Sequence, residues 1–402
     1  MMERRGGFNT RRHDEEGMHM QLNATGLVEL TTGATLPFDP TAYAHEDGQP
    51  DPPVLDVNYD YDTAARQLRS MSSDLAERRD VFRWLPLLPV ATPGPVLPAG
   101  GTPLVSAPRL ARRYGLRTLY LKDETRNPTR CLKDRATAVG VTLALAQGHT
   151  DVYCASAGNA AISLAGFAAH AGLTCHAFVP ASASRTRINW LRRYGAHIHS
   201  STGNYDQAYS ESEAAGARNG WYSRNCALNP FLVEGKKTCA FEIVEATSGE
   251  RLDWVICASG DGCTLGALGK GFREMRAVGF SADLPKLVGV QAEAIQPLVR
   301  RFLGFDEEGE DETTEAQSIA VRAPRNALRL LNEIEASGGA MLAVPDVEIA
   351  AAQRLLATDA GLVAEFTSAA TLAALARLAE ERSLEGQTAV LVITGGRLDE
   401  EG

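Results

Sequence analysis

Short apolar runs alternate with longer helical stretches over most of the chain after Gly100. The apolar runs are rich in β-branched residues, as buried strands are, and read RTLYL, DVYCA, TCHAFV, AHIHS, DWVICA, KLVGVQA and TAVLVIT. The stretches between them are rich in Ala and Leu and favour helices. Strands that alternate with helices build βα units and parallel sheets, so this pattern predicts an α/β fold.

The part of the chain before Gly100 has a different composition. Residues 26–98 are rich in Pro, Asp and Thr and hold one helical stretch, AARQLRSMSSDLAERRDVFRWL, which indicates an N-terminal arm rather than a full domain. Residues 1–25 mix both charge signs and lack the apolar segment of a signal peptide, so we expect a flexible tail. An acidic segment at about 303–325 predicts a solvated loop.

Composition and charge exclude several classes of partner. The 402 residues carry a net charge of -10 and form no basic stripe, which argues against nucleic acid and anionic membranes. No apolar run approaches the roughly 18 residues of a membrane span. The seven cysteines form no CxxC pair, which predicts a cytoplasmic protein without a metal site. The expected ligand is therefore a small molecule.

Three segments place small or polar residues between a strand and a helix, where open α/β sheets bind ligands. NPTRCLKDRATAVG delivers Lys133 to the start of a helix, an unusual place for a cation. VYCASAGNAAISLAGFAAHAG offers a turn that suits a carboxylate, made of Ser156, Ala157, Gly158 and Asn159. WVICASGDGCTLGALGKGF offers a nest that suits a phosphate, made of Gly260, Asp261, Gly262, Cys263 and Thr264.

Other interpretations of the glycine-rich segment fit less well. Its GxGxxxG spacing is one residue longer than the dinucleotide fingerprint and falls late in the chain. The GKG at 269–271 lacks the Ser or Thr that follows the lysine of a Walker loop. A turn that needs glycine only for its backbone geometry stays open as an alternative.

A lysine beside a phosphate nest and a carboxylate turn matches the needs of pyridoxal phosphate. This cofactor is anchored by its phosphate, forms a Schiff base with a lysine and exchanges that lysine for an amino acid. A surface ion pair is the alternative role for Lys133 in KDR. The two companion segments favour the cofactor, so we predict a pyridoxal 5'-phosphate enzyme that acts on an amino acid.

An ordered series of motifs from about residue 54 to 400 resembles the fold-type II pyridoxal-phosphate-dependent enzyme family, and within it the threonine synthases. The series reads LDVNYDYD, LLPV, GGTPL, LYLKDETRNPTRCLKDR, SAGN, YGAHI, GNYDQA, NPFLVEGKKTCAFEI, SGDGCT, VQAE and ITGGRLDE. The resemblance implies a tryptophan synthase β-like fold of two doubly wound parallel-sheet domains, with the cofactor in the cleft between them. It also implies a catalytic region at 99–400, with a smaller subdomain inserted at about 140–240.

The resemblance also assigns roles to single residues. Lys133 would be the Schiff-base lysine and the base for the Cα proton, and Asn159 would contact the phenolic oxygen of the cofactor. Thr394, at the end of TAVLVIT, would face the pyridine nitrogen and favour elimination and replacement over transamination. Residues 260–264 would bind the cofactor phosphate. The amino-acid substrate would contact Ser156, Ala157, Gly158 and Arg187.

The chain departs from the family at three places. The N-terminal arm has no cysteines where many threonine synthases carry a zinc-ribbon-like segment. Cys226, Ala227 and Leu232 stand where an Asn-Ser pair and an arginine hold the substrate phosphate, and we expect Leu232 to line the substrate pocket. Arg224, Asn225, Arg185 and Arg187 are possible replacements. The segment TRCLKDR differs from the family's small residues and Phe before the lysine, and Cys131 is either a small filler or a reactive thiol.

These observations predict a cytoplasmic, homodimeric lyase of amino-acid biosynthesis. The first choice is threonine-synthase-like elimination and replacement at Cβ or Cγ, from O-phosphohomoserine to threonine and phosphate. One alternative is a serine or threonine ammonia-lyase, or a β-replacement synthase that uses an activated serine. An alternative of another class is a non-catalytic pyridoxal-phosphate-binding sensor or partner subunit.

Overall fold

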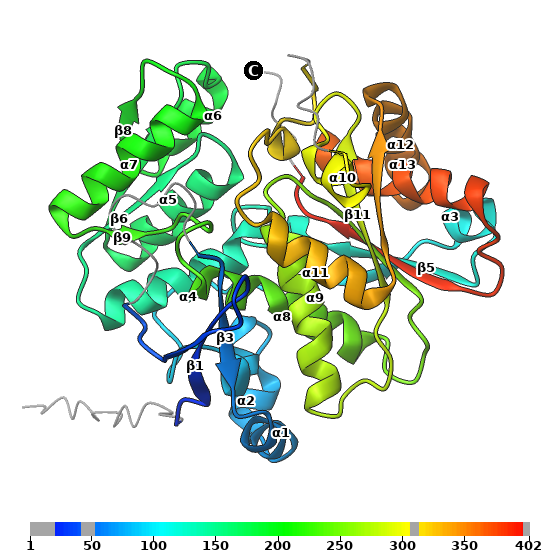
Figure 1. The fold of residues 1–402 in the computed structure, drawn as a ribbon, viewed down its shortest axis with the longest axis horizontal. Coiled ribbons are helices and arrows are strands. Elements are labelled where there is room, and N and C mark those ends of the chain that lie inside the picture. The colour runs from blue at the N-terminus through cyan, green and yellow to red at the C-terminus, as the bar shows by residue number, and fades with distance from the viewer. Residues whose placement is uncertain (1–20, 42–52, 306–312, 397–402) are drawn as a thin grey trace, which may run out of the picture.

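The computed structural model describes residues 21–41, 53–305 and 313–396. The first twenty residues of the predicted tail, and part of the predicted acidic loop, lie outside these ranges. Figure 1 shows a small N-terminal sheet, a four-stranded sheet on one side of the molecule and a six-stranded sheet on the other. Helices α4, α8 and α9 occupy the middle.

The N-terminal arm consists of an antiparallel sheet followed by short helices. Its strands run in the order β2 (Thr35–Pro37), β1 (Ala24–Glu29) and β3 (Leu55–Tyr59). The single helical stretch predicted next is interrupted, because Ser70 ends the first helix and Ser72 caps the second. The three resulting pieces are α1 (Tyr61–Arg69), α2 (Ser73–Glu77) and the 3₁₀ helix η1 (Val81–Leu87).

The four-stranded sheet is parallel throughout. Its strands run in the order β8 (His197–Ser200), β7 (Thr174–Val179), β6 (Asp151–Ala155) and β9 (Tyr222–Ser223). The helices that connect these strands are α5 (Asn159–Ala171), α6 (Arg185–Arg193) and α7 (Tyr205–Asn219). This sheet lies within residues 151–223, inside the range 140–240 proposed for the smaller subdomain.

The six-stranded sheet is parallel except at one edge. Its strands run in the order β12 (Ala340–Val344), β11 (Lys286–Ala292), β10 (Trp254–Ala258), β13 (Thr388–Ile393), β5 (Thr118–Asp123) and β4 (Leu104–Ser106). Only β4 is antiparallel to its neighbour. Every residue of β10 and β13 is buried, as the continuous apolar runs of parallel strands require. The predicted α/β fold is confirmed, with this one antiparallel edge strand.

Further helices, some short and some long, lie in the segments that connect the strands of the six-stranded sheet. They are α3 (Pro108–Arg113), η2 (Glu124–Arg126), α10 (Pro297–Phe302), η3 (Gln317–Ile319), α11 (Ala327–Ser337), α12 (Asp346–Ala360) and α13 (Phe366–Glu381). Within the described ranges, none of the helices combines the length and the apolar character needed to cross a bilayer.

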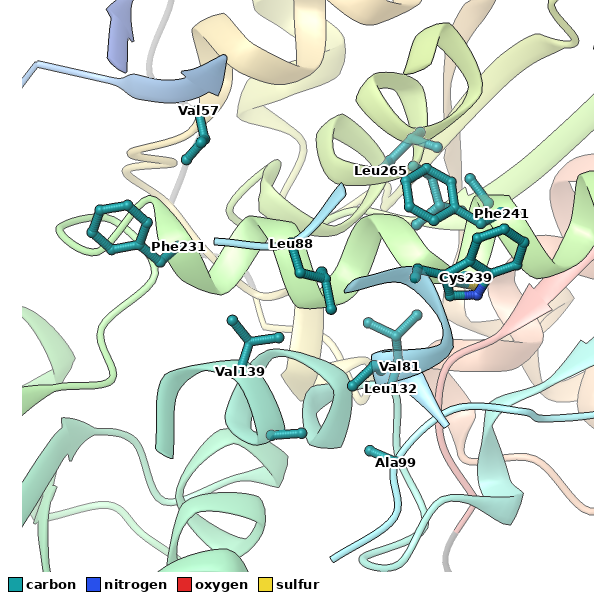
Figure 2. Packing of buried hydrophobic residues seen from close by; sticks show 14 of the residues in the cluster. Val57, Val81, Leu88, Ala99, Leu132, Val139, Phe231, Cys239, Phe241 and Leu265 are labelled. Atoms are coloured by element: carbon teal, nitrogen blue, oxygen red, sulfur yellow. The ribbon is translucent and has the colours of Figure 1, made fainter. Parts of the chain in front are cut away.

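The central helices α4 (Lys133–Ala146), α8 (Phe231–Ala246) and α9 (Cys263–Ala277) form the core between the sheets. Figure 2 shows Phe231 and Phe241 of α8, with Val139 of α4 on one side and Leu265 of α9 on the other. Since α8 is buried along nearly its whole length, it has no solvent-facing side. The starts of α4 and α9 are thereby held on a rigid base.

Candidate active site

A cavity of about 870 Å³ lies where the carboxyl ends of strands from both large sheets meet. Its walls include the ends of β6 and β10, and the starts of α4, α5 and α9. Parallel strands gather ligands at this edge, because the helices that follow them present free backbone N–H groups. The three segments singled out in the sequence therefore line one cavity.

Lys133 is the first residue of α4 and lines the cavity. The backbone before it is fixed to the end of β13, since Leu132 N donates to Thr394 O at 2.8 Å. Burial, followed by the nearby cations Lys236 and Arg224, lowers the pKa of the Lys133 ammonium. A lowered pKa leaves more of the amine neutral, as a nucleophile or a proton acceptor requires.

Thr394 also lines the cavity, directly after β13. Its Oγ1 lies 3.0 Å from Ser368 Oγ of α13. Ser368 Oγ in turn accepts a bond from Gly395 N and donates to Gly395 O, both at 3.0 Å. These contacts fix the position of the threonine hydroxyl at the cavity wall.

The turn after β6 is built for close approach to a ligand. Gly158 caps α5 without a side-chain hydrogen bond, and its N donates to Ser156 Oγ at 3.0 Å. The Asn159 side chain is oriented from the opposite side of the cavity, because its Nδ2 donates to Glu365 Oε1 at 2.8 Å. Ser156, Ala157, Gly158 and Asn159 all line the cavity.

The loop after β10 needs glycine at two positions. Gly262 has a φ of +90° and caps α9, and a Cβ there would lie 2.6 Å from Asn326 O. A Cβ on Gly260 would lie 2.9 Å from Ile319 Cα. The loop is therefore pressed against the segment before α11 while its other side faces the cavity. Gly260, Asp261, Gly262, Cys263 and Thr264 all line that cavity.

The side chain of Asp261 is engaged behind this loop. Its Oδ1 accepts from Arg325 N and its Oδ2 from Asn326 Nδ2, both at 2.7 Å. Asp261 therefore holds the loop against the segment before α11, and only its backbone is available to a phosphate. A carboxylate aimed at the phosphate would repel it.

Two buried cations line the cavity: Arg224, which the sequence offered as a possible phosphate ligand, and Lys236, which it did not. Lys236 of α8 and Arg224, in the turn after β9, are 1% and 4% exposed. Lys236 Nζ donates to Cys263 Sγ at 2.9 Å and to Cys226 Sγ at 3.2 Å. No carboxylate among the described residues forms a salt bridge with Lys236 or Arg224. These cations offer an anion-binding surface.

The expectation that Leu232 lines the substrate pocket is wrong. Leu232 is fully buried and its Cδ2 occupies the space where a Cβ on Gly140 of α4 would lie. Leu232 and Lys236 are one turn apart on the same side of α8. Leu232 packs against Gly140 in the middle of α4, whereas Lys236 lies near Lys133 at the start of α4 and reaches the cavity. The repeated lysines of EGKKT were the available signal for a cation in this helix.

The other candidates divide between the cavity and its surroundings. Arg187 of α6 lines the cavity, whereas Arg185 is absent from its walls. Cys131 is also absent from the walls, and burial, followed by the charge of Asp134, raises the pKa of its thiol to about 12. A filler beside the site is therefore the better description of Cys131.

The second half of the loop predicted at about 303–325 is partly exposed, and it also belongs to the cavity wall. Residues 317–323 and Arg325 line the cavity. Arg325 Nη2 binds Asp206 Oδ1 of α7 at 2.8 Å, and its guanidinium lies 4.2 Å from the ring centroid of Tyr209. This segment joins the two sides of the cavity, a role that its composition does not reveal.

Comparison with known proteins decides the family. The family described as "Pyridoxal-phosphate dependent enzyme" matches residues 96–395. The chain belongs to this family. A threonine synthase of Methanosarcina acetivorans is 35% identical over 349 residues, which cover 86% of this chain and 85% of that protein. A threonine synthase of Methanocaldococcus jannaschii is 34% identical over 375 residues, 91% of each chain.

Solved structures support the same fold. The processed form of threonine deaminase isoform 2 from Solanum lycopersicum has a TM-score of 0.64 at 19% identity, with 74% of this chain and 84% of that chain covered. Maize serine racemase has a TM-score of 0.62 at 18% identity, with 74% and 89% covered. Together with the relatives in sequence, these findings make the protein a pyridoxal-phosphate-dependent lyase of the threonine-synthase-like kind.

Metal binding finds no support in the part of the chain that the structure describes. No group of three or more His, Cys, Asp or Glu side chains is placed there to hold a metal ion. Residues 42–52, part of the cysteine-free stretch 26–57 that was compared with a zinc-ribbon-like segment, lie outside the described residues. The absence of a metal stays a prediction.

Proposed function

We propose that this enzyme converts O-phosphohomoserine into threonine and phosphate. The observation that carries the proposal is the content of one cavity: Lys133, two helix starts without side-chain caps, and the cations Lys236 and Arg224, which have no salt bridge to a described carboxylate. This arrangement suits a cofactor phosphate, a substrate carboxylate and a second anionic group at the far end of the substrate.

The residues present fit pyridoxal phosphate. The phosphate would be held by backbone N–H groups of residues 260–264, because Gly260 and Gly262 leave no room for a side chain on the packed side of the loop. Asn159 and Thr394 would contact the ring. When bound, the cofactor supplies an electron sink for the carbanion that forms when the Cα proton leaves.

The chain's own groups supply binding and proton transfer. Lys133 Nζ would take a proton from Cα of the substrate and then one from Cβ as the phosphate departs from Cγ, and would return protons at Cγ and, after water adds at Cβ, at Cα. The departing phosphate takes up the proton that the added water releases. The lowered pKa of Lys133 suits this work, since the amine must be neutral when it accepts the proton.

The substrate would span the cavity between two anion-binding ends. Its carboxylate would meet the turn of Ser156, Ala157 and Gly158, with Arg187 at the edge. Its phosphate would meet Lys236 and Arg224. These two cations would replace the family's phosphate-binding arginine, at whose position this chain has Leu232. A buried phosphate dianion needs such partners, because it loses its hydration on entering the cavity.

The test offers the purified holoenzyme O-phosphohomoserine, homoserine, serine, threonine, O-phosphoserine and O-acetylserine, and measures phosphate, acetate, ammonia and amino-acid products. We expect phosphate and threonine from O-phosphohomoserine alone. Ammonia from serine or threonine, or a replacement product from an activated serine, would favour the alternative enzymes. Binding without turnover of any compound would favour the sensor.

A second measurement identifies the cofactor lysine. Reduction of the holoenzyme with borohydride, followed by peptide mass spectrometry, should find the pyridoxyl group on Lys133. An adduct only on Lys122, Lys236 or Lys237 would overturn the assignment of Lys133, whatever the substrate.

We further propose that the enzyme works in the cytoplasm as a homodimer. All seven thiols are free, which suits a reducing compartment. The dimer is expected from the family resemblance. Light scattering of the holoenzyme would measure its mass, and a monomer would contradict the proposal.

A further inference from the structure

Two thiols of the cavity share one cation. Cys226 lies in the turn that follows β9, and Cys263 is the first residue of α9. Lys236 Nζ donates to both sulfur atoms, at 3.2 and 2.9 Å, and Cys226 packs against the small cluster of buried residues that contains Cys263. The pair is thus assembled from two segments that are well separated in the chain.

A further cation stands beside Cys226. Arg224 Nη1 donates to Cys226 Sγ at 3.4 Å, so Cys226 has a second cation beside Lys236. The neighbouring Cys263 thiol, then Lys236 and Arg224, hold the pKa of Cys226 well below its usual value against the effect of burial. The Cys226 sulfur and burial raise the pKa of Cys263. Cys226 is therefore the more easily ionised of the two thiols, as an attacking thiol must be, and Cys263 is the candidate resolving thiol.

We propose that Cys226 and Cys263 form a redox-active pair, in which Cys226 is oxidised by hydrogen peroxide and then closes a disulfide with Cys263. The contacts supply what such a pair needs: a half-buried sulfur that faces the cavity, cations that favour its charged form, and a resolving thiol beside it.

The chemistry balances in two steps. The Cys226 thiolate attacks one peroxide oxygen, the O–O bond breaks, and sulfenic acid and hydroxide form. The Cys263 sulfur then attacks the Cys226 sulfur, the S–O bond breaks, and water leaves with the proton of the Cys263 thiol. The two thiols lose two electrons and the peroxide is reduced to water.

The disulfide would change the cavity. It removes the negative charge of Cys226 and ties the turn after β9 to the start of α9, next to the loop of residues 260–264. Lys236 would lose its charged partner. The affinity for the substrate phosphate would change as a result. This effect on affinity rests on the proposed function, whereas formation of the disulfide does not.

The test treats the holoenzyme with a small molar excess of hydrogen peroxide, blocks free thiols with iodoacetamide and maps the peptides by mass spectrometry. We expect a linked pair of peptides that contain Cys226 and Cys263, and its loss after dithiothreitol. Cys226→Ser should remove the linked pair. Cys154→Ser is the matched control and should not, because Cys154 also lines the cavity but burial raises its pKa to about 12.

A second measurement tests the role of the shared cation without relying on the serine variants. The rate of Cys226 alkylation in untreated holoenzyme should fall by roughly tenfold in Lys236→Met, since the thiolate loses its nearest cation. Oxidation or alkylation of wild-type Cys226 no faster than that of Cys154 would overturn the proposal. Stepwise oxidation of Cys226 to sulfonic acid without a link to Cys263 would also overturn it.

Discussion

Lys236 and Lys237 are neighbours in α8 and both are almost fully buried, yet the groups around their ammonium ends differ. Lys237 Nζ pairs with Glu234 and, at 2.7 Å, with Glu274, and it lies 4.1 Å from the ring centroid of Tyr59. Lys236 Nζ meets two sulfur atoms and the open cavity. Carboxylates surround Lys237, whereas thiols and the open cavity surround Lys236.

The carboxylate partner Glu234 of Lys237 belongs to a larger network of buried ion pairs. Lys270 of α9 binds Glu234 at 2.7 Å and Asp56 of β3 at 3.0 Å, and Arg329 of α11 binds the same Asp56 at 2.7 Å. These ion pairs tie the N-terminal arm to the central helices. Buried charges of this kind specify how elements fit together, because breaking one pair leaves an uncompensated charge.

A second paired network supports the helix that carries Lys133. Arg135 of α4 binds Glu124 and Glu242, each at 2.7 Å, and Lys122 of β5 binds Glu242 at 2.7 Å. The cavity side differs in that Lys133, Lys236 and Arg224 have no salt bridge to a carboxylate of the described residues. The difference teaches that these two networks compensate their buried cations with carboxylates, whereas Lys133, Lys236 and Arg224 are placed to meet a ligand.

The largest effect is expected from Lys133→Ala. Loss of the general base should lower kcat by about 10²–10⁴-fold, while the free energy of unfolding stays close to wild type, because no carboxylate loses its partner. Steady-state kinetics and urea unfolding measure the two quantities. The exposed Lys286→Ala serves as control. A large loss of stability in Lys133→Ala would place this lysine with the structural cations.

Lys237→Met should destabilise the fold by about 3–5 kcal/mol, because Glu234 and Glu274 lose a buried partner. The folded fraction should keep its KM for substrate. Thermal and urea unfolding, compared with Lys236→Met, test this contrast between adjacent residues. Equal losses of stability in the two variants would break the comparison.

Low pH should weaken the ion-pair network of Arg135, Lys122 and Glu242 and so lower the free energy of unfolding. The positive charges of Arg135 and Lys122, against the effect of burial, lower the pKa of Glu242 from its ordinary 4.5 to about 2. The carboxylate therefore contributes stability above its ordinary pKa, roughly 3 kcal/mol, which is lost as the pH falls toward the lowered value. Urea unfolding from neutral pH down into this acid range should show the loss, and Glu242→Gln should flatten it. A profile unchanged by Glu242→Gln would contradict the assignment.

Lys236→Met should affect substrate more than stability. Loss of one hydrogen bond to a charged phosphate costs about 1.5–3 kcal/mol, so KM for O-phosphohomoserine should rise roughly 10- to 100-fold. The free energy of unfolding should change little, since no carboxylate loses its partner. Binding of a substrate without a phosphate is the control. An unchanged KM would assign the phosphate to Arg224 or Arg187 instead.

The sequence by itself determined the features that depend on neighbours along the chain. Apolar runs and helical stretches in alternation predicted the α/β fold, since strands buried on both faces need continuous apolar residues. The small residues at 156–159 and 260–264 marked two helix starts, because only such residues let a backbone approach an anion closely. Lys133 could be identified for the same local reason, directly after a turn and at the start of a helix.

The tertiary structure alone decided what depends on packing between distant segments. Successive residues of a helix point about 100° apart, so EGKKT cannot say which lysine faces the cavity when α8 is buried all around. Leu232 and Lys236 share one side of α8, but α4 covers Leu232 at Gly140 and leaves Lys236 at the cavity. In the same way, the carboxylate of Asp261 turns from the phosphate loop to Arg325 because α11 begins beside it. These choices are made by close packing, which no local pattern of residues encodes.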